Sequence, residues 1–81
     1  MPELAFNTTV TFWRLAADHG GVIRSILQTG EWTFGDAITH VISQPGDEQW
    51  RFAVVHGAFA IDHLDMLRLA DTNTFEQWQR R

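Results

Sequence analysis

Ten aromatic side chains in a chain of 81 residues without a single cysteine limit what this sequence can fold into. A domain of this length is marginally stable alone, and small domains commonly add disulfides, a metal ion or a partner subunit. Disulfides are excluded because cysteine is absent. Each aromatic side chain can bury roughly 150–250 Å², which is enough for ten of them to dominate a small core. We therefore expect a single aromatic-rich domain over residues 1–81.

The charge balance argues against nucleic acid as a partner. The formal net charge is −4, and all six cationic side chains are arginines. Proteins that bind phosphate backbones usually carry a basic patch, whereas the one basic cluster here is Arg80-Arg81. No apolar run approaches the ~20 residues that a membrane helix needs, and the first residues lack the pattern of a signal peptide. We expect a cytoplasmic protein without a membrane or nucleic-acid partner.

The first segment, residues 7–30, has apolar side chains at helical spacing. Side chains that would share one helix face recur every three or four residues: Phe12, Leu15 with Ala16, His19, Ile23 and Ile26. Asn7 is a favourable N-cap and Gly30 a favourable stop. Gly20 and Gly21 each cost about 1 kcal/mol of helix propensity relative to Ala. The spacing predicts one helix with a weak point or a break at the glycine pair.

Two runs rich in β-branched and aromatic residues, 38–43 and 49–56, flank a turn sequence. Pro45-Gly46 suits the central positions of a type II turn, because Pro fixes φ and Gly accepts the positive φ that follows. Two such runs joined by a turn are typical of a β-hairpin. We favour this interpretation for the middle of the chain.

A helix is the competing interpretation of residues 34–43. Thr33 followed by Asp36 resembles a capping box, with Asp where Glu or Gln is usual. The apolar positions Phe34, Ala37, Ile38, Val41 and Ile42 then fall on one face of a helix. A small all-α domain with a helix-turn-helix-like centre would follow from this alternative.

The C-terminal part gives one open choice and one helix. Residues 59–61 could form a third strand of a meander or open a helix. Asn73 followed by Glu76 is a capping box that would start a short helix with Phe75 and Trp78 on one face. The preferred architecture is α+β: an N-terminal helix packed on a small antiparallel sheet, whose hairpin turns at Pro45-Gly46, and a C-terminal helical segment.

Histidines and carboxylates supply the candidate site for a ligand or a pH-dependent switch. In the hairpin register, His40 lies among apolar side chains opposite Phe52, and a histidine can change its charge near neutral pH. A histidine with a carboxylate can hold a metal or transfer protons, and Asp62 and His63 are sequence neighbours, although adjacent side chains point in different directions. No metal-ligand spacing, phosphate loop or nucleophile motif is present. We assign no catalytic residue, no metal ligand and no cofactor.

Tryptophan and arginine dominate the energetics of many protein interfaces. Trp32, Trp50, Arg51 and Trp78 are therefore the candidate interface residues, since four Trp residues exceed what a chain of this length readily buries. We expect a non-enzymatic protein–protein interaction module, such as an accessory, inhibitor or regulatory protein, that acts as a homodimer or on another protein. One alternative is a small ligand- or metal-binding protein or enzyme using His40, His63 and Asp62. Another is a helix-turn-helix transcriptional regulator.

Overall fold

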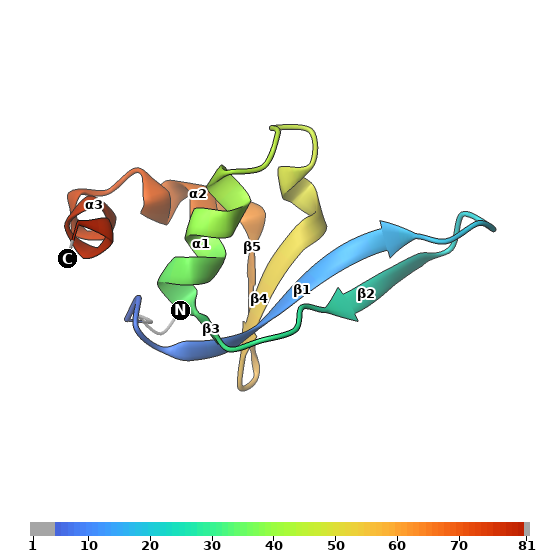
Figure 1. Cartoon of the computed structure of the whole chain (residues 1–81), viewed down its shortest axis with the longest axis horizontal. Coiled ribbons are helices and arrows are strands. Elements are labelled where there is room, and N and C mark those ends of the chain that lie inside the picture. Colours follow the sequence, from blue (N-terminus) through green and yellow to red (C-terminus); the bar gives the residue numbers. More distant parts are fainter. Residues whose placement is uncertain (1–4, 81) are drawn as a thin grey trace.

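The computed structural model describes residues 5–80 and has the α+β architecture that we expected (Figure 1). Its elements, in chain order, are β1 (Thr9–Ala17), β2 (Ile23–Leu27), β3 (Trp32–Thr33), α1 (Phe34–Ile42), the 3₁₀ turn η1 (Gln49–Arg51), β4 (Phe52–His56), β5 (Phe59–Asp62), α2 (His63–Ala70) and α3 (Asn73–Gln79). The strands form one antiparallel sheet in the order β2-β1-β4-β5, and β3 pairs with the start of β1.

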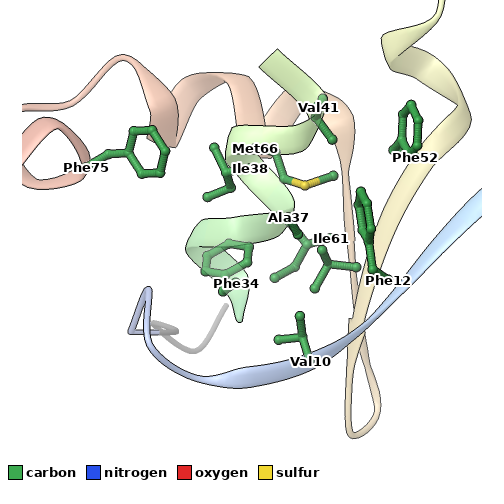
Figure 2. Close-up of a cluster of buried hydrophobic side chains, with 11 residues drawn as sticks. Val10, Phe12, Phe34, Ala37, Ile38, Val41, Phe52, Ile61, Met66 and Phe75 are labelled. Atoms are coloured by element: carbon green, nitrogen blue, oxygen red, sulfur yellow. The ribbon is translucent and has the colours of Figure 1, made fainter. Parts of the chain in front are cut away.

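The hydrophobic core lies between one face of the sheet and the three helices (Figure 2). The strand register places Phe12 opposite Val54, and Val54 opposite Ile61. Because side chains alternate between the two faces of a strand, these residues mark the face that the helices cover. The buried residues of the three helices complete the core: Phe34, Ala37, Ile38 and Val41 from α1, Met66 from α2 and Phe75 from α3.

The predicted helix over residues 7–30 is wrong, because β1 and β2 form a hairpin there. Oδ1 of Asp18 accepts hydrogen bonds from the backbone N–H groups of Gly20 at 2.8 Å and Val22 at 3.0 Å. Gly21 has a φ of 78°, which glycine adopts without strain. The glycine pair is therefore the turn of a hairpin, and β-branched and aromatic residues before it favour the strand. The helical spacing of the apolar residues was coincidental.

The hairpin predicted around Pro45-Gly46 is also wrong, because residues 34–42 are the helix α1. The competing interpretation was correct for this segment: the side chain of Thr33 caps α1 by accepting a hydrogen bond from Asp36 N at 3.1 Å. One buried apolar face and this cap outweigh the β-branched content. The all-α alternative is wrong because the chain forms a β-sheet, and the helix-turn-helix-like arrangement that followed from it is wrong for the same reason.

The C-terminal helical segment is confirmed, and the strand predicted at residues 59–61 is correct because β5 pairs with β4. The meander itself is wrong, because the other neighbour of β4 is β1 and not residues 38–43. The cap of α3 is Thr72, whose hydroxyl accepts from Phe75 N at 3.2 Å, and not Asn73 as the capping box predicted. Phe75 and Trp78 do lie on one face of α3, with stacked rings 5.8 Å apart. Helices α2 and α3 thus close one end of the core.

Candidate interaction surface

The distal half of the β1–β2 hairpin extends beyond the rest of the molecule. Pairing between β1 and β4 ends at Arg14 and Phe52, whereas pairing between β1 and β2 continues to Ala17. We call residues 15–27 the arm. Figure 1 shows the arm projecting away from the three helices, and it contributes to the elongated dimensions of 43 × 27 × 24 Å. No helix packs over the arm in the described chain, and residues 17–27 are all exposed.

Strand β2 carries large apolar side chains on a surface where polar ones are usual. All five of its residues are exposed. Four of the eight large hydrophobic side chains exposed in the described chain belong to the arm: Val22 at 56%, Ile23 at 58%, Ile26 at 48% and Leu27 at 50%. Side chains alternate along a strand, so the register places Ile23 and Leu27 on one face of the arm and Val22 and Ile26 on the other. Single exposed apolar residues are normal, but several gathered on one element can mark a binding surface. The arm is therefore the strongest candidate site in the described chain.

The sheet face opposite the helices continues this apolar surface, and we call it the open face. The register places Trp13, Leu15 and Leu27 on it, together with Ala53 and Val55 of β4. The same register also places Thr11, Ser25 and Asp62 on this face.

A short hydrogen-bond chain fixes the indole of Trp13 on the open face. Nε1 of Trp13 donates to Oγ1 of Thr11 at 3.1 Å, and this hydroxyl donates to the carbonyl of Val55 at 3.1 Å. The polar groups of both side chains are thereby satisfied within the molecule. What remains available on this side is the apolar surface of the indole, held in one orientation by two bonds.

Two of the predicted interface residues, Trp32 and Trp78, make their contacts within the domain. Nε1 of Trp32 donates to the carbonyl of Thr29 at 3.0 Å, and its ring lies 4.6 Å from that of Phe12. Nε1 of Trp78 donates to Oδ1 of Asn7 at 2.7 Å. Both indoles are half-buried and pack against the core, so they contribute to the stability of the fold itself.

The other two predicted interface residues, Trp50 and Arg51, are brought together at η1. The Arg51 guanidinium lies 4.7 Å from the centroid of the Trp50 ring, which is 43% exposed. Arg51 also pairs with Glu48 and donates to the carbonyl of Leu15 at 3.4 Å. Leu15 lies just past the end of β4 pairing, so Arg51 covers the edge of β1 at the base of the arm.

His40, Asp62 and His63 lie in separate local environments. The ring of His40 on α1 meets the rings of Phe12, Trp32 and Phe52 edge-on, with centroids 5.2–5.5 Å apart. Asp62 is the N-cap of α2 and accepts from Asp65 N at 3.0 Å, and His63 begins that helix. Within residues 5–80, no group of three or more His, Asp or Glu side chains is placed to hold a metal ion.

No family model, curated protein or solved structure matches this chain. The function of the chain is therefore inferred from its own surface. None of the helices in the described part of the chain has the length and apolar character needed to cross a membrane.

Sequence reasoning missed the arm because it assigned residues 7–30 to a helix. One signal could have identified it: Asp18 to Gly21 separates two runs of apolar and β-branched residues. Three to five residues with glycine between such runs predict a hairpin. Exposure of the aliphatic residues could not have been inferred from the same pattern, because it depends on where β4 and the helices end.

Proposed function

We propose that this chain is a non-enzymatic protein–protein interaction module that binds its partner through the arm and the adjoining open face. The observation that supports this function is the exposure of Val22, Ile23, Ile26 and Leu27, of which Val22 immediately precedes the terminal strand β2 and the other three lie in it. Natural proteins usually protect such strands with charges, proline, bulges or a covering element. A partner that covers β2 would supply that protection.

The energy available from covering the arm is large enough to support binding. Full burial of a Val, Leu or Ile side chain contributes about 1.5–3 kcal/mol. The four arm side chains are each about half exposed, so covering them would contribute about 1 kcal/mol each. The fixed indole of Trp13 on the open face adds aromatic area that loses little conformational freedom on binding.

Site-specific photo-crosslinking tests this function in the cells that produce the protein. A photoreactive amino acid would replace Leu27 in one version and Leu64 in the other. Leu64 is a matched control because it is 51% exposed on α2, compared with 50% for Leu27 on the arm. We expect discrete protein adducts from position 27, their loss when Ile23→Glu is added, and few adducts from position 64.

Equal crosslinking at both positions, or none at position 27, would contradict the proposal. Circular dichroism of the Ile23→Glu variant checks that the fold survives. The fold should survive because Ile23 is 58% exposed and lies outside the core. Loss of adducts then reports on binding rather than on unfolding.

A further inference from the structure

We propose that the partner of the arm is a second copy of this chain, joined by antiparallel pairing of the two β2 strands about a two-fold axis at Ser25. The inference rests on the proposed function, since it names the partner of the same surface. It makes two specific claims: the occupant is this chain, and the contact is made edge to edge by backbone hydrogen bonds.

The backbone of β2 has three residues that face away from β1. Asp18 N donates to the carbonyl of Val22 at 2.9 Å, and Gln28 N donates to the carbonyl of Phe12 at 2.8 Å. Pairs that exchange hydrogen bonds alternate along an antiparallel ladder. The even-numbered residues of β2 therefore bond to β1, whereas Ile23, Ser25 and Leu27 direct their N–H and C=O groups outward. β2 is the last strand of the sheet on this side.

These three residues form a self-complementary edge. A two-fold axis at Ser25 places Ser25 opposite Ser25 of the second copy, and Ile23 opposite Leu27 of the second copy. Every outward N–H and C=O group then finds a partner, because all three positions become hydrogen-bonded pairs. Aliphatic residues face each other on the open face, which is the cross-strand pairing that stabilises sheets.

Other registers of the same pairing are less complete. An axis at Arg24 or Ile26 keeps outward-facing residues opposite each other but pairs only two of the three, and at Arg24 it places two guanidinium groups directly opposite. Pairing of odd with even positions would bring inward-facing groups to the junction and turn the side chains to the wrong faces. An axis at Leu27 would place Glu31 opposite Ile23, so a carboxylate would lie against an aliphatic side chain. An axis at Ile23 would place Ser25 opposite Gly21 of the second copy, which lies in the turn before β2. The register centred on Ser25 pairs the whole strand with itself.

The distribution of charge favours a second copy at the arm. The arm contains one anion, Asp18, and one cation, Arg24, whose carboxylate and guanidinium lie 3.4 Å apart. The formal net charge of −4 therefore belongs entirely to the remaining residues. Two copies would repel through their acidic bodies, but the arm offers a neutral contact. In the proposed register Arg24 faces Ile26 of the second copy, so no like charges lie directly opposite each other.

The remaining edges of the sheet are better protected than β2. The strand β5 at the opposite edge has four residues and ends at Asp62, which is engaged as the cap of α2. Arg51 covers the edge of β1 beyond β4 by donating to the carbonyl of Leu15. β2 has no proline, and its one charge, Arg24, lies on an inward-bonding position. Of the two outer strands in the order β2-β1-β4-β5, β2 is thus the longer and the one better suited to pairing.

Disulfide trapping tests the register, and the absence of cysteine from the chain makes it specific. In the proposed dimer the two Ser25 Cα atoms form a hydrogen-bonded pair about 5.5 Å apart, which suits a disulfide. Val22 is the matched control on the same arm, since its counterpart in the second copy would lie about 20 Å away. In a glutathione buffer, Ser25→Cys should form the covalent dimer at least about tenfold faster than Val22→Cys.

Equal rates for the two cysteine variants would indicate random collision and would overturn the proposal, as would the absence of a dimer from Ser25→Cys. Sedimentation velocity on the cysteine-free protein gives the second measurement. We expect a weak, concentration-dependent dimer that Ser25→Pro shifts to monomer, because proline removes an outward N–H that β1 does not use. Ser25→Ala should dimerise like the wild type.

The outcomes separate this inference from the proposed function. If position 27 crosslinks to a different protein while the purified chain stays monomeric, the arm is a binding surface but the second copy is the wrong partner. If the chain dimerises and Ser25→Pro has no effect although it folds, the edge register is wrong. If position 27 yields no protein adduct and the chain is monomeric, both proposals fail.

Discussion

Replacement of Gly35 by alanine tests how tightly α1 is packed against the C-terminal helix. A Cβ atom at position 35 would lie 2.6 Å from both Cζ2 and Cζ3 of Trp78, and closer still to Cη2. The indole has little freedom to move away, since it stacks on Phe75 and donates a hydrogen bond to Asn7. The substitution therefore forces either the helix or the ring out of place.

The expected cost is the difference between two opposing effects. Overpacking a well-filled site costs about 1–3 kcal/mol. Alanine in place of glycine in a helix contributes about 0.5–1 kcal/mol in the opposite direction. We therefore expect Gly35→Ala to lower the free energy of unfolding by about 1–2 kcal/mol. For a domain of this size that corresponds to a melting temperature roughly 5–15 °C lower.

A double-mutant cycle with Trp78→Phe isolates the contact. Phenylalanine lacks the distal part of the indole that meets the new Cβ, so alanine at position 35 should be neutral or stabilising in that background. Urea unfolding followed by far-UV circular dichroism gives the four stabilities. The reasoning is refuted if Gly35→Ala is as stable as the wild type, or if its cost is the same with Trp or Phe at position 78.

Two further substitutions test the core and the cap of α1. Phe12 is fully buried, so Phe12→Ala should lower the free energy of unfolding by about 3–5 kcal/mol in chemical denaturation. Phe59 is 48% exposed, so Phe59→Ala should change this free energy little. Similar losses in the two variants would contradict the placement of the core. Thr33→Ala should lower the free energy of unfolding, measured by thermal unfolding, by about 1 kcal/mol, because it removes the hydrogen bond from Asp36 N. Thr33→Ser keeps the hydroxyl and should retain most of this stability. An equal loss of stability in both variants would show that the hydroxyl is not the cap.

The α+β class and the C-terminal helices could be predicted from the sequence, but the order of strands could not. For residues 34–43, local patterns indicated either a hairpin strand or a helix. Pro45-Gly46 favoured the strand, and the cap at Thr33 favoured the helix. The cap was the better signal because it satisfies a specific backbone N–H. The turn residues only permit a hairpin, and here they join α1 to η1.

Pairing of β1 with β4 links residues about 40 positions apart, such as Phe12 and Val54. No local pattern indicates that β1 pairs with β4, and without this pairing residues 7–30 could not be assigned to strands. The same gap affected the candidate site. Residue type pointed to tryptophans as interface residues, but Trp32 and Trp78 are engaged within the domain, whereas Ile23 and Leu27 are exposed. Exposure depends on where the covering elements end, which is a property of the whole fold.

The hydrogen bond between Asn7 and Trp78 joins residues 71 positions apart and has a consequence for the order of folding. On the ribosome, the strand that follows Asn7 is made well before the helix that holds Trp78. The hairpin of β1 and β2 can form early, since its contacts are local. Closure of the core must wait for α3 to leave the exit tunnel. During that interval the ring of Phe6 lacks Phe75 and Trp78, against which it packs in the finished fold, so synthesis itself exposes the nascent chain to aggregation.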